Sequence, residues 1–247
     1  MKSIESNRNF MKSNYDSWQS PTPSDQMQGI PAPDLQKKPN SDSTLITLPK
    51  ALVTEAHLFE TLLHRRSVRT FSNESMNLEE LSLMLESSCR IQKVIGDNVA
   101  SFRPAPSGGA RHPFETYIAV RDVKDLEAGY YHYLPLTHQL EKLSGSFDAQ
   151  SVVDSVNGQK FAENANVTFY LSAIPYRAEW RYGLRSHKVM LLDLGHLAQN
   201  IYLSAEGIGA GACGIASYDQ EKSDALFGLD GEDEFVVYIL PVGKKIK

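Results

Sequence analysis

Three guanidinium groups and one hydroxyl lie within five consecutive residues: Arg65, Arg66, Ser67, Val68 and Arg69. A guanidinium presents a planar fork that binds a phosphate through two parallel hydrogen bonds. A phosphate monoester carries about −1.5 to −2 charges at neutral pH, so this density of donors is typical of a phosphate-binding motif. The run also suits a solvated basic helix end, where cations interact favourably with the helix dipole. Taken alone, it leaves both interpretations open.

A second cluster is the loop at residues 103–113. Prolines stiffen this loop, and Gly108 and Gly109 allow a ligand to approach the backbone closely. A flat ring such as an isoalloxazine needs such a surface, with exposed amides and no side chains in the way. An ordinary turn that leads into the next strand is the alternative.

A glycine-rich turn at residues 209–214 matches the pattern G-x-G-x-x-G. The dinucleotide-binding fingerprint requires a strand before the glycines and a helix after them. Here a predicted helix precedes the turn and a predicted strand follows it. The pattern therefore does not indicate a dinucleotide site, although a glycine-lined turn beside a cofactor remains open.

Two polar groups on the predicted helices need separate interpretations. Asp193, His196 and Asn200 form a polar stripe; they lack the further ligands of a metal site, so we expect a hydrogen-bonded network at an interface and no metal. Arg181 and Tyr182 form a candidate acid–base pair. A phenol is a poor base at neutral pH unless a cation stabilises its phenolate.

The cations available to Tyr182 are Arg177, Arg181 and Arg185. They support an acid–base role for its hydroxyl. Surface arginines around a half-buried aromatic ring are the alternative.

The elements that would position these residues follow from hydrophobic periodicity. Asn77 and Glu80 form a predicted capping box. A helix that is apolar nearly all round is predicted at 188–206, to be buried in a core or at a subunit interface. Strands and helices alternate without a regular βαβ rhythm, which favours the α+β class. The predicted helices are 56–65, 78–93, 188–206 and 219–227, and the predicted strands are 114–121, 129–134, 166–174, 211–216 and 235–241.

Composition narrows the function classes. The chain has 247 residues, a net charge of −5 and two cysteines. This charge disfavours a general nucleic-acid binder, and the cysteines form neither a disulfide framework nor a zinc pattern. The sequence shows no apolar run long enough for a membrane span and no signal peptide, so we expect a cytoplasmic protein.

The proline-rich segment at residues 1–45 lacks apolar periodicity. Its composition predicts an extended or disordered N-terminal arm, which either stays disordered or wraps a partner subunit. The folded domain is predicted at residues 46–247.

Together these motifs resemble the SagB-type branch of the nitroreductase family over residues 28–243. The run at 65–69 is similar to the family's phosphate motif, and residues 106–113 (PSGGARHP) are similar to the branch's P-S-x-G-x-x-H-P loop. Residues 192–200, followed by 209–213, resemble its L-D-x-G-H-x-x-Q-N and G-x-G-x-C runs. Motifs in this order are specific to the branch.

The resemblance implies an α+β fold with a central mixed sheet flanked by helices. It also implies a two-fold homodimer that holds FMN between its protomers, and it shifts our expectation for the arm towards subunit wrapping. The residues expected at the ribityl phosphate are Arg65, Arg66, Ser67 and Arg69. Those expected along the isoalloxazine are Pro106, Ser107, Gly108 and Gly109. Those expected to close the site are Ala212, Cys213, Gly214, Lys244 and Lys245.

Members of the branch oxidise thiazolines or oxazolines to azoles on a ribosomal peptide or a peptide-synthetase intermediate, with a Lys–Tyr pair at the reacting ring. Arg181 and Tyr182 stand in that place here, and Arg cannot act as a base. We therefore expect an FMN-dependent oxidoreductase that converts an azoline to an azole on a peptide or peptide-like substrate, with Tyr182 as the base. The expected partners are a peptide substrate and a cyclodehydratase or peptide synthetase. A generic NAD(P)H-dependent nitro or quinone reductase and a non-catalytic flavin-binding scaffold are the alternatives.

Overall fold

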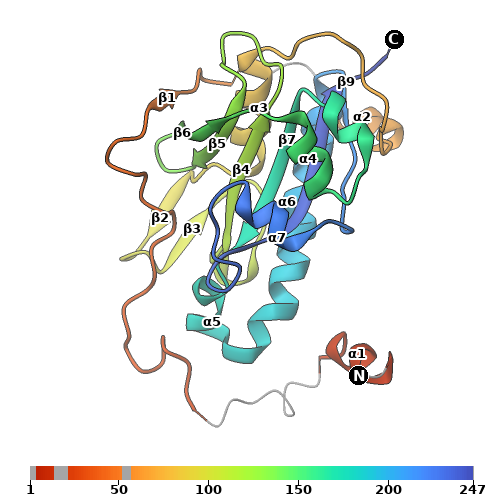
Figure 1. Cartoon of the computed structure of the whole chain (residues 1–247). Coiled ribbons are helices and arrows are strands. Elements are labelled where there is room, and N and C mark those ends of the chain that lie inside the picture. Colours follow the sequence, from red (N-terminus) through yellow and green to blue (C-terminus); the bar gives the residue numbers. More distant parts are fainter. Residues whose placement is uncertain (1–3, 14–21, 52–56, 247) are drawn as a thin grey trace.

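The computed structural model describes residues 4–13, 22–51 and 57–246 (Figure 1). A seven-stranded sheet in the order β1-β6-β5-β4-β7-β9-β8 forms the centre of the described part. Its strand pairs are antiparallel, and the parallel contacts are isolated bridges such as Ser67 with Ala212. The strands are β1 (Leu45–Thr47), β4 (Phe114–Val120), β5 (Gly129–Leu134), β6 (Gln139–Ser146), β7 (Val167–Ala173), β8 (Ala210–Ala212) and β9 (Phe235–Lys244), with β2 (Lys93–Ile95) and β3 (Ala100–Phe102) in a separate hairpin.

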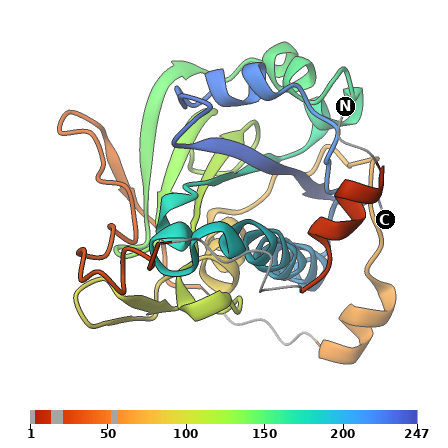
Figure 2. The ribbon, with the colours of Figure 1, turned by 90° about the horizontal axis from the view of Figure 1, so that it is seen from below.

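Helices cover both faces of the sheet (Figure 2). The α-helices are α1 (Ile4–Phe10), α2 (Leu58–His64), α3 (Leu78–Ser88), α4 (Ala149–Ser155), α5 (Tyr176–Tyr182), α6 (Ser186–Gly207) and α7 (Gln220–Ala225). Short 3-10 turns are η2 (Gly108–Ala110), η3 (Lys160–Asn164) and η4 (Gly183–Arg185).

Two hydrophobic cores lie on the two faces of this sheet. The larger core joins α3 and α6 to strands through residues such as Met84, Ile201 and Phe169. The smaller core joins α4 to the opposite face through Val152, Tyr170 and Ile239. Because helices cover both faces, β4 and β7 are buried at every position and do not alternate between buried and exposed residues. These layers confirm the predicted α+β class.

The helix α3 begins as the sequence predicts, with a capping box between Asn77 and Glu80. It ends at Ser88, however, so its predicted extension to residue 93 is wrong. Lys93–Ile95 instead pairs with β3, and Gly96, at φ +61°, supplies the turn of that hairpin.

The helix α6 is longer than predicted and is buried on one side only. Its buried residues recur at spacings of three and four and include Met190, Leu194 and Ile201. Leu191 and Leu192 remain more than half exposed in the single chain. The helix is therefore amphipathic within one protomer, and its exposed leucines are available to a second one.

Other boundaries also differ from the predictions. The predicted strand 211–216 is shorter and ends at Ala212. The Cys213 N–H still donates to the Pro241 carbonyl, but Pro241 has no N–H to donate in return, so the regular ladder ends there. The predicted helix 56–65 begins at Leu58, and Ala56 lies outside the described residues. The strand β6 and the helix α5 were not predicted, since both are rich in polar residues.

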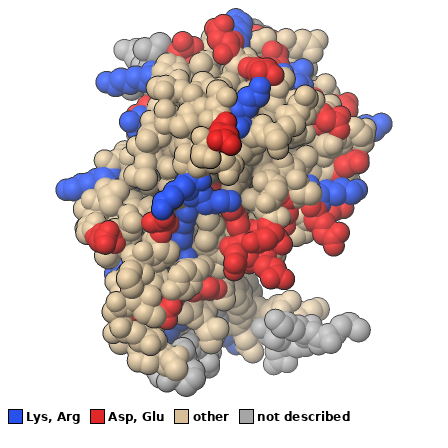
Figure 3. Space-filling view, turned by 60° about the vertical axis from the view of Figure 1, so that its left-hand side comes forward, with Lys and Arg blue, Asp and Glu red and all other residues tan. Residues whose placement is uncertain are grey.

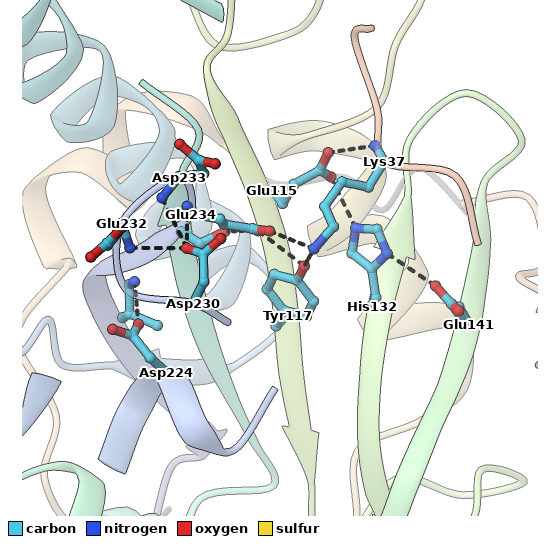
Figure 4. A network of polar contacts seen from close by, with 12 residues as sticks. Lys37, Glu115, Tyr117, His132, Glu141, Asp224, Asp230, Glu232, Asp233 and Glu234 are labelled. Carbon is cyan, nitrogen blue, oxygen red and sulfur yellow. Dashed lines mark hydrogen bonds and ion pairs between the residues drawn. The ribbon is translucent and has the colours of Figure 1, made fainter. Parts of the chain in front are cut away.

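Part of the N-terminal arm packs on its own chain. Lys37 N–H donates to Glu115, and the Lys37 ammonium contacts Glu234 at 2.5 Å. Further along, the backbone N–H of Asn40 donates to Glu141. Figure 4 shows the contacts of Lys37, together with the ring of His132 between Glu115 and Glu141. Residues 37–43 are thereby held against β4, β5 and β6, whereas residues 1–3 and 14–21 lie outside the described part of the chain.

No helix among the described residues is long and apolar enough to cross a membrane. Both cysteines are free and buried. On the face seen in Figure 3, basic and acidic side chains are interspersed, and one group of acidic side chains gathers near its centre.

Candidate active site

The first group of predicted site residues meets between α2 and β8, and we call it the phosphate end: residues 65–69 with residues 212–214. Ser67 forms a parallel bridge with Ala212, and the backbone N–H of Val68 donates to the Ala212 carbonyl at 2.9 Å. Arg69 lies close enough to the Cys213 thiol to oppose the rise that burial causes in the pKa of that thiol. Two motifs that are about 140 residues apart in sequence are thus brought together, as the prediction requires.

The arginines of the phosphate end are not neutralised. Among the described residues, Arg65, Arg66 and Arg69 have no carboxylate within ion-pair distance. Arg65 lies over the ring of Tyr202, 5.3 Å from its centroid. Arg66 instead donates to the carbonyls of Leu63 and Arg65 at the end of α2, as the helix-end interpretation expects.

Lys244 and Lys245 already have acidic partners. The Lys244 ammonium contacts Glu80 at the start of α3, and the Lys245 ammonium contacts Glu206 at 2.5 Å. The backbone of Lys244 is nevertheless near the phosphate end, because its carbonyl accepts from the N–H of Ser72, which follows Arg69 by three residues. Neither lysine ammonium is free to meet a phosphate unless it leaves its carboxylate.

The second group, which we call the ring loop, comprises Pro106–Gly109. A Cβ added to Gly109 would lie 2.4 Å from the hydroxyl of Tyr182 and 2.9 Å from Nε of Arg181. Gly109 also has φ +60°, in the left-handed region that favours glycine. The ring loop therefore lies directly against the predicted catalytic pair at the end of α5.

Arg181 and Tyr182 are both half-buried. The Arg181 guanidinium carbon is 5.7 Å from the centre of the Tyr182 ring. Arg177 does not join them: it is buried, and its guanidinium donates to Glu115 at 2.6 Å. The expected set of three cations around Tyr182 is wrong in this respect, because the Glu115 carboxylate attracts Arg177 into the interior.

The phosphate end and the ring loop lie along different parts of α6. The ring loop contacts Asp193, whereas the phosphate end contacts Tyr202. Nine residues separate these contacts, which is about 14 Å along a helix at 1.5 Å per residue. Within one chain the two groups of predicted cofactor residues are therefore set apart along α6.

Two residues that hold the site were not identified as site residues from the sequence. The hydroxyl of Tyr202 accepts from the backbone N–H of Gly214 while its ring faces Arg65. Asp193 accepts from Ser107 and Gly108, although the sequence placed it in an interface network. Each residue contacts a loop that is remote in sequence, so the spacing of residues along the helix does not predict either contact.

The other two residues of the polar stripe on α6, Asn200 and His196, have different surroundings. Asn200 donates to the Ser87 carbonyl at 3.1 Å, and His196 is exposed. Within the described part of the chain, no group of three or more His, Cys, Asp and Glu residues could hold a metal ion.

These features fit a ligand that is anionic at one end and flat at the other. Among the described residues, Arg65 and Arg69 have no carboxylate within ion-pair distance, which suits a phosphate, and the glycine backbone of the ring loop allows the close approach that a planar ring needs. At Gly108 a Cβ would lie 2.3 Å from Val189, so the loop also packs closely on α6. The donor set is therefore compatible with FMN.

Comparison with known proteins gives the family. The Nitroreductase family matches residues 62–244. The chain is 31% identical to MJ1384 of Methanocaldococcus jannaschii, provisionally named a nitroreductase, over 83% of this chain and 99% of that protein. It is 33% identical to the microcin B17-processing protein McbC of Escherichia coli, but over only 43% of this chain and 41% of McbC.

Solved structures show the same fold. A provisionally named nitroreductase from Anabaena variabilis superposes with a TM-score of 0.72 at 26% identity, covering 83% of this chain and 42% of that one. A chain of the E. coli microcin synthetase McbBCD complex, with truncated pro-MccB17 bound, gives a TM-score of 0.61 at 20% identity, covering 93% and 84%. The similarity to McbC supports the SagB-type branch that the motifs indicated. The chain belongs to the nitroreductase family.

Proposed function

We propose that the protein is an FMN-dependent oxidoreductase that dehydrogenates a heterocycle on a peptide or peptide-like substrate, from azoline to azole. The observation that carries this proposal is the contact between the ring loop and Tyr182: the Tyr182 hydroxyl lies 2.4 Å from where a Cβ of Gly109 would be. This contact supports a role for the phenol next to the glycine backbone along which a flat cofactor would lie.

In the proposed reaction the azoline loses two hydrogen atoms, one as a hydride with both electrons and one as a proton. FMN, when bound, would supply the acceptor for the hydride. Tyr182 would take the proton at its hydroxyl oxygen and pass it to solvent, and Arg181 lies beside its ring. The arginines of the phosphate end anchor the cofactor, and the ring loop orients its flat part.

A peptide substrate is supported by the relatives. McbC is named for the processing of microcin B17, and a second relative, TfxB of Rhizobium leguminosarum, is named for the processing of trifolitoxin. TfxB is 33% identical over 52% of this chain and 36% of its own length. Because these matches cover less than half of either relative, substrate and partners are part of the proposal.

We further propose that the cofactor lies between two protomers. The phosphate end and the ring loop are separated along α6, and the same helix exposes Leu191 and Leu192. The helix α2, beside the phosphate end, has no buried residue and exposes Leu58, Phe59, Leu62 and Leu63. A two-fold partner packed on these residues would bury them and place its ring loop near the phosphate end of the first protomer.

A generic NAD(P)H-dependent nitro or quinone reductase is the second candidate. The observation in its favour is Arg181, which stands where the azoline oxidases carry a lysine. An arginine at this position supports binding of an anionic group and removes a possible base.

Substrate tests separate the two candidates. Stopped-flow mixing of the flavin-loaded protein with a thiazoline-containing peptide should bleach the flavin absorbance and give the thiazole, with a mass loss of two hydrogens. Mixing with NADH or NADPH should then be slow. Rapid reduction by NAD(P)H without reaction of the thiazoline would overturn the azoline proposal in favour of the reductase.

Loss of cofactor affinity tests the phosphate end. Hydrogen bonds to charged groups contribute about 1.5–3 kcal/mol, so Arg65→Ala and Arg69→Ala should each weaken FMN binding roughly tenfold or more. Lys38→Ala is the matched control, because it removes an exposed positive charge that pairs with Asp34 at 3.8 Å in the N-terminal arm.

A further inference from the structure

One buried carboxylate holds the ring loop in place. Asp193 on α6 is only 6% exposed. Its Oδ2 accepts from the Ser107 hydroxyl at 2.7 Å and from the Gly108 N–H at 2.9 Å, and its Oδ1 accepts from the same N–H at 3.1 Å. Ser107 and Gly108, the two residues directly before Gly109, are thus bound to one side chain.

The same contacts extend to the far end of the loop. The Ser107 oxygen, which donates to Asp193, also accepts from the backbone N–H of His112 at 2.9 Å. A chain of hydrogen bonds therefore runs from α6 through Ser107 to His112. Because the serine hydroxyl is oriented by Asp193, the position of the loop's C-terminal end depends on the same carboxylate.

A small cavity adjoins the start of this loop. It has a volume of about 10 Å³ and is lined by residues that include Ala105, Pro106, His112, Asp193 and Leu197. A space of that size holds about one water molecule. Atoms that border a cavity lack contacts on that side, so the hydrogen bonds to Asp193 add a restraint where packing is incomplete.

The loop is also restrained sterically by both helices. Gly108 leaves no room for a Cβ beside Val189 on α6, and Gly109 leaves none beside Tyr182 on α5. The loop is therefore clamped between Asp193 on α6 and Tyr182 on α5. A small shift of the loop away from Asp193 would change the surface that Gly108 and Gly109 present.

We propose that Asp193 is the positioning residue of the ring loop: its bonds to Ser107 and Gly108 set the backbone surface on which the flat part of the cofactor lies. This inference rests on the proposed function. It assigns no catalytic contact to Asp193, which acts through the loop. Loss of the carboxylate should weaken FMN binding and change the environment of the bound ring.

The test compares Asp193→Asn with Asp224→Asn. Asp224 is a matched control: it is 4% exposed and accepts from the backbone N–H of Val236 at 2.7 Å and from Gln220 at 2.9 Å. It belongs to α7, a helix on the other face of the sheet from α6. Both changes remove a buried carboxylate with similar bonds, so both should lower the urea midpoint of the apoprotein.

Only the Asp193 change should affect the cofactor. Fluorescence titration should show the Kd for FMN raised at least tenfold in Asp193→Asn and changed less than twofold in Asp224→Asn. At saturating FMN, the visible circular dichroism of Asp193→Asn should lose intensity, because the ring is held less uniformly. Loss of stability alone would not change the spectrum of a saturated site.

Ser107→Ala tests the same restraint without altering α6. It should raise the Kd for FMN by a smaller factor. The double variant with Asp193→Asn should bind FMN no more weakly than Asp193→Asn alone, since both changes remove one network.

If Asp193→Asn does not fold, Ser107→Ala still decides: a Kd and a dichroism spectrum equal to those of the wild type would overturn the inference. Wild-type protein that binds no FMN would instead overturn the proposed function, and tight binding by every variant would overturn the positioning role alone.

Discussion

The two residues that touch at the ring loop, Gly109 and Tyr182, define the chemistry of the proposed site. Removal of only the phenolic oxygen in Tyr182→Phe should lower turnover of a thiazoline peptide by about 10²–10⁴-fold, the usual contribution of an acid–base group. FMN content should stay unchanged. Tyr176→Phe is the matched control, since Tyr176 lies on the same helix and its hydroxyl bonds to Asp25 at the surface. Turnover of Tyr182→Phe within twofold of the wild type would show that Tyr182 only packs.

Arg181→Lys is a companion change, because it restores the residue type of the azoline oxidases. If Arg181 has adapted the site to another substrate, the lysine variant should oxidise a thiazoline peptide faster than the wild type. Product formation measured by mass spectrometry checks this. An unchanged or lower rate would contradict the idea that arginine is a departure from azoline chemistry.

The close approach at Gly109 gives a further prediction. Gly109→Ala should cost stability, because an L-residue is disfavoured at φ +60° by about 1–2 kcal/mol. It should also displace Tyr182 or the loop and so reduce both FMN affinity and turnover. Gly228→Ala is the control: Gly228 has φ +65° and nothing within 4 Å of an added Cβ. Gly228→Ala should carry the backbone cost alone, so a larger stability loss and a cofactor defect are expected only in Gly109→Ala. Intact FMN binding in both variants would be inconsistent with the proposed ring loop.

At this scale the sequence indicated residue types better than residue partners. The arginines at 65–69 and the turn at 212–214 could each be recognised from their own composition, and the structure brings them together. The sequence could not show that Arg177 turns inward, since its partner Glu115 is 62 residues away and buried. The same limit applied to Asp193 and Tyr202, whose partners lie in loops.

Among the secondary-structure elements, β4, β5 and β6 share a buried ionic cluster that also holds the arm. Burial lowers the pKa of His132, but its hydrogen bonds to Glu115 and Glu141 raise it from 6.5 to about 9. Burial raises the pKa of Glu115, whereas Arg177 and His132 together lower it from 4.5 to about 2. These opposite shifts define the pH range in which the cluster stabilises the fold.

The direction of the pH dependence follows from the linkage between protonation and folding. The His132 contribution is complete below pH 6.5 and is lost as the pH rises through 9; the Glu115 contribution is complete above pH 4.5 and is lost as the pH falls towards 2. The free energy of unfolding in urea should therefore decline between pH 6.5 and 9 in the wild type, and much less in His132→Gln. His57→Gln, at an exposed histidine, should keep the wild-type slope. An identical slope in His132→Gln would contradict this assignment.

Elements with strong local signals were the ones that could be predicted. The α3 capping box and the periodic apolar residues of α6 both correspond to helices in the structure. The end of α3 was missed because the polar residues around Cys89 fit a helix as well as a turn. The strand β6 was missed because its outer half is exposed and polar, so it shows neither alternation nor a buried run.

For the whole molecule, the central expectation is a two-fold dimer. Leu191 and Leu192 are 55% and 57% exposed on a helix that also contacts both ends of the site. The paired change Leu191→Asp with Leu192→Asp should convert a particle of about twice 27.5 kDa into one of 27.5 kDa and should release FMN. Leu136→Asp, at a leucine 45% exposed in the β5–β6 turn, should change neither. Light scattering with absorbance detection measures both, and a flavin-loaded monomer would contradict the shared site.

The most direct test of the account is the identity of the bound cofactor. The arginines at 65–69, which have no carboxylate within ion-pair distance among the described residues, and the glycine backbone of the ring loop predict a yellow purified protein. Heat denaturation followed by chromatography should release FMN, and not FAD, at about one molecule per chain. Protein stripped of cofactor should regain the flavin spectrum on titration with FMN. A colourless protein that takes up no FMN, although folded by circular dichroism, would contradict the account.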